Sequence, residues 1–154
     1  MAFSIKFVNR DNYQRTVCWF PERNHSGIKD NNYPDIPGTI VPGRKSVTVG
    51  MPDSGNHALR PGWVGAFRTI FDGGDPFTPA VRGEVNFEDI LTWYDISMVD
   101  NNSDNSGVHW LYPISGNDVH HGCTTFPCSN AFSKPGEAQT QVTNEHDLEC
   151  LIGG

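Results

Sequence analysis

Two carboxylates on neighbouring predicted strands are the residues in this sequence best placed to do chemistry. The run RGEVNFEDILTWYDISMVD, residues 82–100, contains two segments in which apolar and polar side chains alternate, as in half-buried strands. If these segments pair, Glu84 and Asp95 share a solvent-facing surface, where two carboxyl groups could bind a polar ligand or act as general acid and base. In a regular strand Asp100 would point to the face opposite Asp95, so it joins the two carboxylates only if the chain turns after Val99. The simpler interpretation of such a cluster is a solvated strand face.

One arginine and two tryptophans are candidates for further contacts to a ligand. Arg68 interrupts an apolar row of the predicted strand at residues 63–71, and an ion pair with a nearby carboxylate explains it better than catalysis does. Trp93 and Trp110 lie in predicted strands and offer flat rings on which a sugar could stack, although a tryptophan in a strand more often packs in a core.

The four cysteines can form two disulfides. Cys123 and Cys128 are close enough in the run CTTFPC to close a small loop, which leaves Cys18 and Cys150 as the second pair. A bridge between those two would close a long loop and stabilise the fold by about 4–5 kcal/mol on a chain-entropy estimate. Four cysteines allow three pairings, so the alternatives stay open.

A zinc site is the competing use of the cysteine-rich segment, because His120 and His121 stand beside Cys123 and Cys128. The spacing matches no common zinc motif, and adjacent histidines do not easily face one centre. The chain also contains no glycine-rich phosphate loop, no GxSxG elbow and no HExxH helix. We therefore expect no metal and no cofactor.

Glycine and proline interrupt the sequence every few residues. With 16 Gly and 11 Pro among 154 residues, no helical pattern of useful length survives between them. The sequence predicts an all-β protein with a single domain over residues 1–154. Besides the segments in 82–100, the expected strands cover residues 3–8, 15–20, 39–41, 46–49, 63–71, 108–114 and 147–152. We expect the first two strands to form a hairpin around residues 9–13.

The charge balance narrows the choice of partner. Lys and Arg number 11 against 18 Asp and Glu, and the resulting net charge of −7 argues against nucleic acid or an anionic membrane as partner. No apolar run approaches the roughly 18 residues needed to span a bilayer. Met1 leads directly into a predicted strand, so we expect no signal peptide in this sequence. The paired cysteines and the glycosylation sequons at Asn24 and Asn101 favour a secreted protein in its mature form over an intracellular one.

The order of several motifs resembles the thaumatin-like proteins. From the first predicted strand to Asp100, these motifs are IKFVNRDNYQRTVCWF, GTIVPGRKSVTV, GWVGAFRT, GEVNF and TWYDISMVD. The C-terminal runs SGVHWLYP, GCTTFPCSNAF and DLEC are similar to small secreted fungal proteins with this core, some of which carry a deoxyribonuclease label. The resemblance implies an antiparallel β-sandwich, export and disulfides. The disulfide-rich second lobe of the larger family has no counterpart in a chain of this length.

The resemblance also implies an acidic cleft, which the larger family builds from an Arg-Glu-Asp-Asp-Asp set. The Glu of that set falls on Glu84, the Asp of its YDxSxVD motif on Asp95, and the Asp that ends this motif on Asp100. Arg68 and Arg82 compete for the arginine, and the last Asp of the set has no clear counterpart.

The first function that the resemblance implies is that of a secreted binding module. It would act in defence, against fungi or as an effector, and bind cell-wall β-1,3-glucan through the acidic face together with Trp93, Trp110 and Arg68. A host or competitor protein is the other partner that we consider, and we expect a monomer.

Two enzymatic alternatives use the same carboxylates. In a weak β-1,3-glucanase, Glu84 would be the acid and Asp95 the nucleophile or base, while Asp100 raises the pKa of Glu84 by repulsion between like charges. In a secreted nuclease, all three carboxylates would hold a divalent cation.

Overall fold

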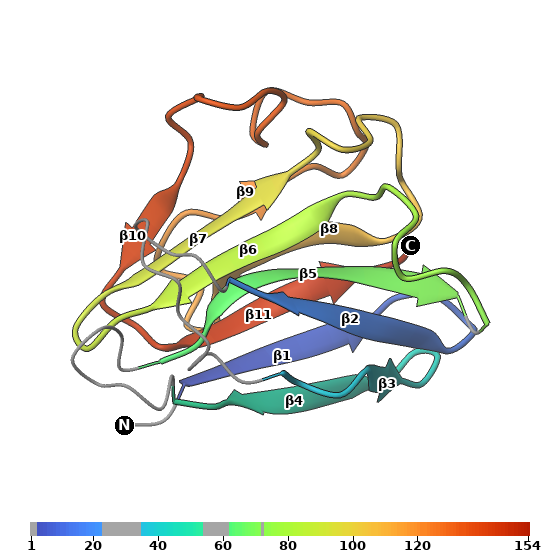
Figure 1. The fold of residues 1–154 in the computed structure, drawn as a ribbon, viewed down its shortest axis with the longest axis horizontal. Helices are drawn as coiled ribbons and strands as arrows, with labels where there is room; N and C mark the ends of the chain where they lie inside the picture. Colours follow the sequence, from blue (N-terminus) through green and yellow to red (C-terminus); the bar gives the residue numbers. More distant parts are fainter. Residues whose placement is uncertain (1–2, 23–34, 54–61, 72) are drawn as a thin grey trace.

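Every regular element that the structure describes is a β-strand (Figure 1). A computed structural model describes residues 3–22, 35–53, 62–71 and 73–154; the sequon at Asn24 lies outside them. Their strands form two sheets that pack face to face around one hydrophobic core. This β-sandwich confirms the predicted fold class. No helix that could cross a membrane occurs among the described residues.

The two sheets differ in the part of the chain that they use. The five-stranded sheet joins both ends of the described chain, in the order β4 (Ser46–Met51), β1 (Phe3–Asn9), β11 (Asp147–Ile152), β8 (Val108–Pro113) and β9 (His121–Gly122). The six-stranded sheet carries the candidate carboxylates, in the order β10 (Gln141–Thr143), β7 (Thr92–Ser97), β6 (Arg82–Phe87), β5 (Val64–Phe71), β2 (Arg15–Pro21) and β3 (Thr39–Val41).

The predicted hairpin of the first two strands is wrong. β1 pairs with β4 and, in parallel, with β11, whereas β2 pairs with β3 and β5 in the other sheet. Asn9 helps to fix the crossing between the sheets, because its side-chain amide donates to the carbonyl oxygens of Tyr13 at 2.9 Å and Val41 at 3.0 Å. Alternation predicts which side chains of a strand face inward, but it does not name the partner strand.

The alternation of β6 places the candidate site. Val85 and Phe87 face the core, so Arg82, Glu84 and Asn86 face outward. Residue 83, between Arg82 and Glu84, must be glycine, because a Cβ at this position would collide with the ring of Phe67 on β5. The backbone of β6 next to Glu84 therefore packs directly against this core ring.

One of the two predicted disulfides is present. Cys123 and Cys128 are bonded, as the run CTTFPC predicts. The pairing of Cys18 with Cys150 is wrong, because both thiols are free. Cys150 is fully buried on β11, whereas Cys18 alternates with core residues of β2 and points to the outer face of the other sheet. The six-stranded sheet itself separates the two sulfurs.

Candidate functional site

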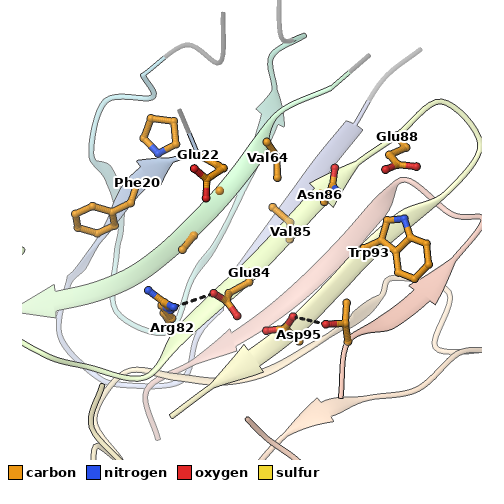
Figure 2. Close-up of a pocket in the computed structure, with 14 residues that line it drawn as sticks. Phe20, Glu22, Val64, Arg82, Glu84, Val85, Asn86, Glu88, Trp93 and Asp95 are labelled. Atoms are coloured by element: carbon orange, nitrogen blue, oxygen red, sulfur yellow. Dashed lines mark hydrogen bonds and ion pairs between the residues drawn. The ribbon is translucent and has the colours of Figure 1, made fainter. Parts of the chain in front are cut away.

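Glu84 and Asp95 occupy directly opposed positions of the antiparallel strands β6 and β7 (Figure 2). Side chains opposed in this way have Cβ atoms about 4.5–5.5 Å apart, and both of these project from the outer face of the six-stranded sheet. Asp95 is nevertheless only 6% exposed. Its Oδ2 accepts a hydrogen bond from the Thr140 hydroxyl at 3.3 Å, while its buried Oδ1 has no hydrogen-bond partner.

Burial raises the pKa of Asp95 well above its ordinary value, and the negative charge of the neighbouring Glu84 adds to the shift. The hydrogen bond from Thr140 and the positive charge of Arg82 oppose the shift but do not cancel it. Burial therefore favours the protonated form of Asp95. The roles suggested by the sequence, Glu84 as acid and Asp95 as nucleophile or base, stay predictions.

Asp100 reaches this group through two arginines. The chain bends after Met98, so Asp100 comes to the outer face despite its parity. Arg82 lies 3.1 Å from Glu84 and 3.6 Å from Asp100, and Arg68 also lies 3.6 Å from Asp100. Arg82 therefore links Asp100 to Glu84, and the predicted effect of Asp100 on Glu84 stays a prediction.

Arg68 has the structural role that its sequence context favours. Its side chain is 14% exposed, donates to the Thr78 carbonyl oxygen at 3.0 Å, and lies over the Phe20 ring with 4.9 Å between the guanidinium carbon and the ring centre. It does not line the hollow beside Glu84, and its predicted contact with a ligand stays a prediction.

A hollow of about 780 Å³ opens over the carboxyl pair, in the range of ligand-binding clefts. Phe20 stands on one side and Trp93 on the other (Figure 2). The polar part of the lining is mostly acidic with one cation and consists of Glu22, Arg82, Glu84, Asn86, Glu88, Asp95 and Thr140. Both aromatic side chains and the acidic groups therefore face the same space.

Trp110 does not belong to this hollow. It lies on β8 of the five-stranded sheet, where its neighbour Leu111 is fully buried and Trp110 itself is partly exposed. Trp110 therefore projects from the opposite face of the sandwich. The structure therefore does not bring Trp110 together with Trp93.

The histidines and acidic residues do not assemble a metal site: in the described ranges, no three His, Cys, Asp or Glu side chains come together so that they could hold an ion. His121 is fully buried, where its Nδ1 accepts from the Ile96 amide at 2.8 Å and its Nε2 meets Gln139 Oε1 at 3.1 Å. Burial lowers the pKa of His121. The geometry offers no support for a cation held by Glu84, Asp95 and Asp100.

Two residues of the site escaped the sequence analysis. Thr140 lies in the polar run KPGEAQTQ and carries no sign of its contact with Asp95. The sequence did indicate Phe20. It lies on the same outward face of its strand as Cys18, and a phenylalanine on that face indicates a partly covered surface.

The topology and the motifs of the outer face define a thaumatin-like β-sandwich, and solved structures bear this out. The crystal structure of the protein elicitor MoHrip2 from Magnaporthe oryzae superimposes with a TM-score of 0.64 over 99% of this chain and 100% of that chain, at 13% sequence identity. The thaumatin-like xylanase inhibitor TLXI superimposes with a TM-score of 0.55 over 96% of this chain and 97% of that one, also at 13% identity.

Sequence comparison gives a narrower assignment. No family model matches the chain. The antigenic protein SchS21 of Stachybotrys chartarum is 30% identical over 153 residues, which cover 97% of this chain and 94% of SchS21. The chain belongs to the same family as SchS21.

Proposed function

We propose that the protein is an extracellular defence or effector-type module that binds cell-wall polysaccharide, specifically β-1,3-glucan, in the hollow over Glu84 and Asp95. The observation that carries this proposal is the position of this carboxyl pair between Phe20 and Trp93. Aromatic rings offer flat apolar surfaces to sugar rings, and carboxyl oxygens accept hydrogen bonds from sugar hydroxyls. Both kinds of contact are available within one open hollow.

The environment of Asp95 favours binding over hydrolysis. A glycosidase needs one protonated carboxyl group and one ionised carboxylate that acts as nucleophile or base. Burial raises the pKa of Asp95 and so disfavours the ionised form that the glucanase alternative assigns to it. The glucanase alternative, with Glu84 as acid and Asp95 as nucleophile or base, is therefore the less favoured.

Two further observations support an extracellular location and a role in defence or as an effector. The Cys123–Cys128 disulfide is typical of an oxidising compartment outside the cytosol. The similar folds of an elicitor and of a xylanase inhibitor support a role in defence or as an effector. A protein partner in place of a glycan is therefore the second candidate.

A pelleting assay tests the proposal. Purified protein is incubated with insoluble β-1,3-glucan, and both the pelleted protein and the released reducing ends are measured. We expect pelleting without release, and a strong loss of pelleting in Trp93→Ala, because the ring on one side of the hollow is gone. Trp110→Ala is the matched control on the opposite face and should pellet like the wild type.

The other outcomes separate the alternatives. Reducing ends that appear with the wild type and vanish with Glu84→Gln would establish the glucanase instead. If the wild type stays in the supernatant, glucan is not the ligand, and the xylanase-inhibition and elicitor assays that suit a protein partner become the next test.

A further inference from the structure

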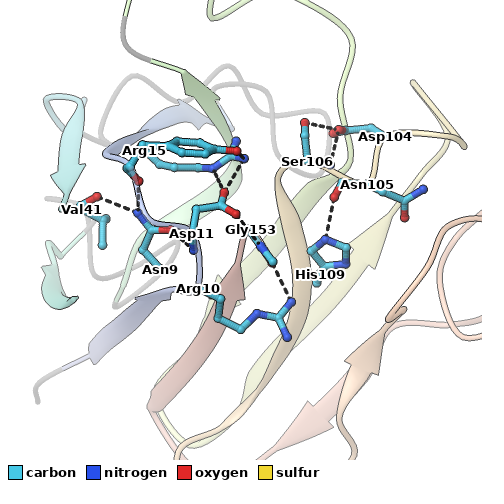
Figure 3. Close-up of polar contacts among 12 residues, drawn as sticks. Asn9, Arg10, Asp11, Arg15, Val41, Asp104, Asn105, Ser106, His109 and Gly153 are labelled. Carbon is cyan, nitrogen blue, oxygen red and sulfur yellow. Dashed lines mark hydrogen bonds and ion pairs between the residues drawn. The ribbon is translucent and has the colours of Figure 1, made fainter. Parts of the chain in front are cut away.

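A second hollow lies beside the start of β2, and Figure 3 shows the polar contacts around Asp11, Arg15 and Ser106, which line it. It has a volume of about 380 Å³ and is lined by Asp11, Tyr13, Arg15, Asn105, Ser106 and Gly154. Arg15 begins β2, whereas Phe20 of the first hollow lies near its end. At a rise of about 3.3 Å per residue, these positions are about 17 Å apart. The two hollows are therefore separate sites.

Arg15 is buried with one part of its guanidinium unpaired. The residue is 1% exposed, and its Nε and Nη2 donate to Asp11 Oδ2 at 2.7 and 2.6 Å. The ring of Phe71 covers the guanidinium at 4.3 Å from its carbon to the ring centre. Nη1 has no hydrogen-bond partner. Leaving a buried donor without an acceptor is unfavourable, so a ligand in the hollow that supplied an acceptor to Nη1 would be favoured.

The charges around Arg15 select a neutral acceptor. Partial burial alone would raise the pKa of Asp11, but hydrogen bonds from the Gly154 amide and Arg15 lower it, so Asp11 is ionised and already neutralises the guanidinium. Asp104 adds a second carboxylate next to the hollow, where it accepts from the Ser106 hydroxyl at 2.7 Å. An anionic ligand would meet two carboxylates in a chain of net charge −7.

Tyr13 supplies an apolar surface to the hollow. Its side chain is 49% exposed, and its ring lies 5.4 Å between centres from that of Phe71, which is 47% exposed. The lining residues thus combine a buried guanidinium with an unpaired Nη1, carboxylate and hydroxyl acceptors, and an exposed aromatic ring. Sugar rings match this set, because their hydroxyls both accept and donate hydrogen bonds while their C–H groups are apolar.

We propose that the hollow beside Arg15 binds a neutral sugar ring and is a second saccharide site, independent of the hollow over Glu84 and Asp95. Two sites on one chain would let the protein hold two segments of a polysaccharide at once. Such bivalent attachment raises the overall affinity without a new kind of contact.

Amide NMR of the full chain tests this site separately from the first. Two neutral trisaccharides, one of β-1,3-linked glucose and one of β-1,4-linked N-acetylglucosamine, are titrated at millimolar concentration. We expect a saturable shift of the amides of Asp11, Tyr13, Asn105 and Ser106 with at least one of them. Tyr13→Ala should weaken that response about tenfold, which corresponds to about 1.4 kcal/mol.

Two more variants keep the test decisive. Arg15→Lys keeps the positive charge but removes Nη1, and should weaken the same response in protein that still unfolds cooperatively. Trp93→Ala affects the other hollow and should leave this response unchanged. The proposal is overturned if neither trisaccharide shifts these amides, if Tyr13→Ala responds like the wild type, or if inorganic sulfate produces the shifts and the sugars do not.

Discussion

Asp95 stands directly opposite Glu84 across the β6–β7 pair and is almost fully buried, and this burial raises the pKa of Asp95. A second negative charge close to Glu84 in a partly buried place would be costly, so the protonated form of Asp95 is favoured. In that form Asp95 offers an O–H donor at the floor of the hollow.

The first prediction concerns pH. The pKa of Asp95 in the folded state lies above the value of 3.8 expected for the unfolded chain, so the folded state binds the proton more tightly. The resulting stabilisation is complete below that value and is lost as the pH rises towards the folded pKa. Asp95→Asn cannot ionise and should gain stability relative to the wild type, by at most about 1.4 kcal/mol per pH unit between about pH 4 and 7.

Urea unfolding of both proteins across this range measures the effect. Their other carboxylates titrate in common and cancel in the difference. If the unfolding free energies of the wild type and of Asp95→Asn change with pH in parallel, the pKa of Asp95 is not raised in the folded state.

The second prediction concerns the cysteines. Mass mapping without reduction should recover the Cys123–Cys128 bridge together with two thiols at Cys18 and Cys150. Reduction should destabilise the fold by about 2 kcal/mol, the entropy estimate for so short a loop. Cys18→Ser should leave this loss unchanged, and a cross-linked peptide containing Cys18 and Cys150 would contradict the structure.

The third prediction concerns the close packing under the site. Gly83→Ala forces a methyl group into the ring of Phe67 and should cost about 1–3 kcal/mol of unfolding free energy. Phe67→Leu shortens the obstructing ring, so the double variant should lose less than the sum of the single losses. Simple additivity in this cycle would mean that the two residues do not touch.

The fourth prediction separates the two arginines at Asp100. Arg68→Ala removes a carbonyl hydrogen bond and a ring contact from a mostly buried side chain, and should cost about 1–3 kcal/mol. Arg82→Ala breaks ion pairs that are one-third exposed and should cost at most about 1 kcal/mol. Equal losses in denaturant unfolding would argue against the structural role of Arg68.

Alternation along each strand was enough to predict the faces of the sandwich and much of the candidate site. Glu84 and Asp95 do share a surface, and Trp93 has the parity to join them. Trp110 and Cys18, in contrast, were each grouped with a residue that lies in the other sheet, Trp93 and Cys150 respectively. Which sheet a strand enters depends on pairings between distant segments, and no local pattern encodes those.

Contacts from irregular segments were also out of reach. Asp100 comes to the arginines through a bend after β7, and Thr140 reaches Asp95 from a run without hydrophobic pattern. The burial that raises the pKa of Asp95 is likewise not encoded in the alternation of its strand.

The parallel pairing of β1 with β11 has a consequence for how the chain folds during synthesis. The paired segments are 143 residues apart in sequence, as in the hydrogen bond from Ser4 to Asp147. On a ribosome, β1 emerges early and waits with one edge unpaired until β11 is made. Sheets that depend on such distant contacts fold slowly, in milliseconds to seconds. Until β11 is synthesised, the nascent chain exposes the edge of β1 that pairs with it.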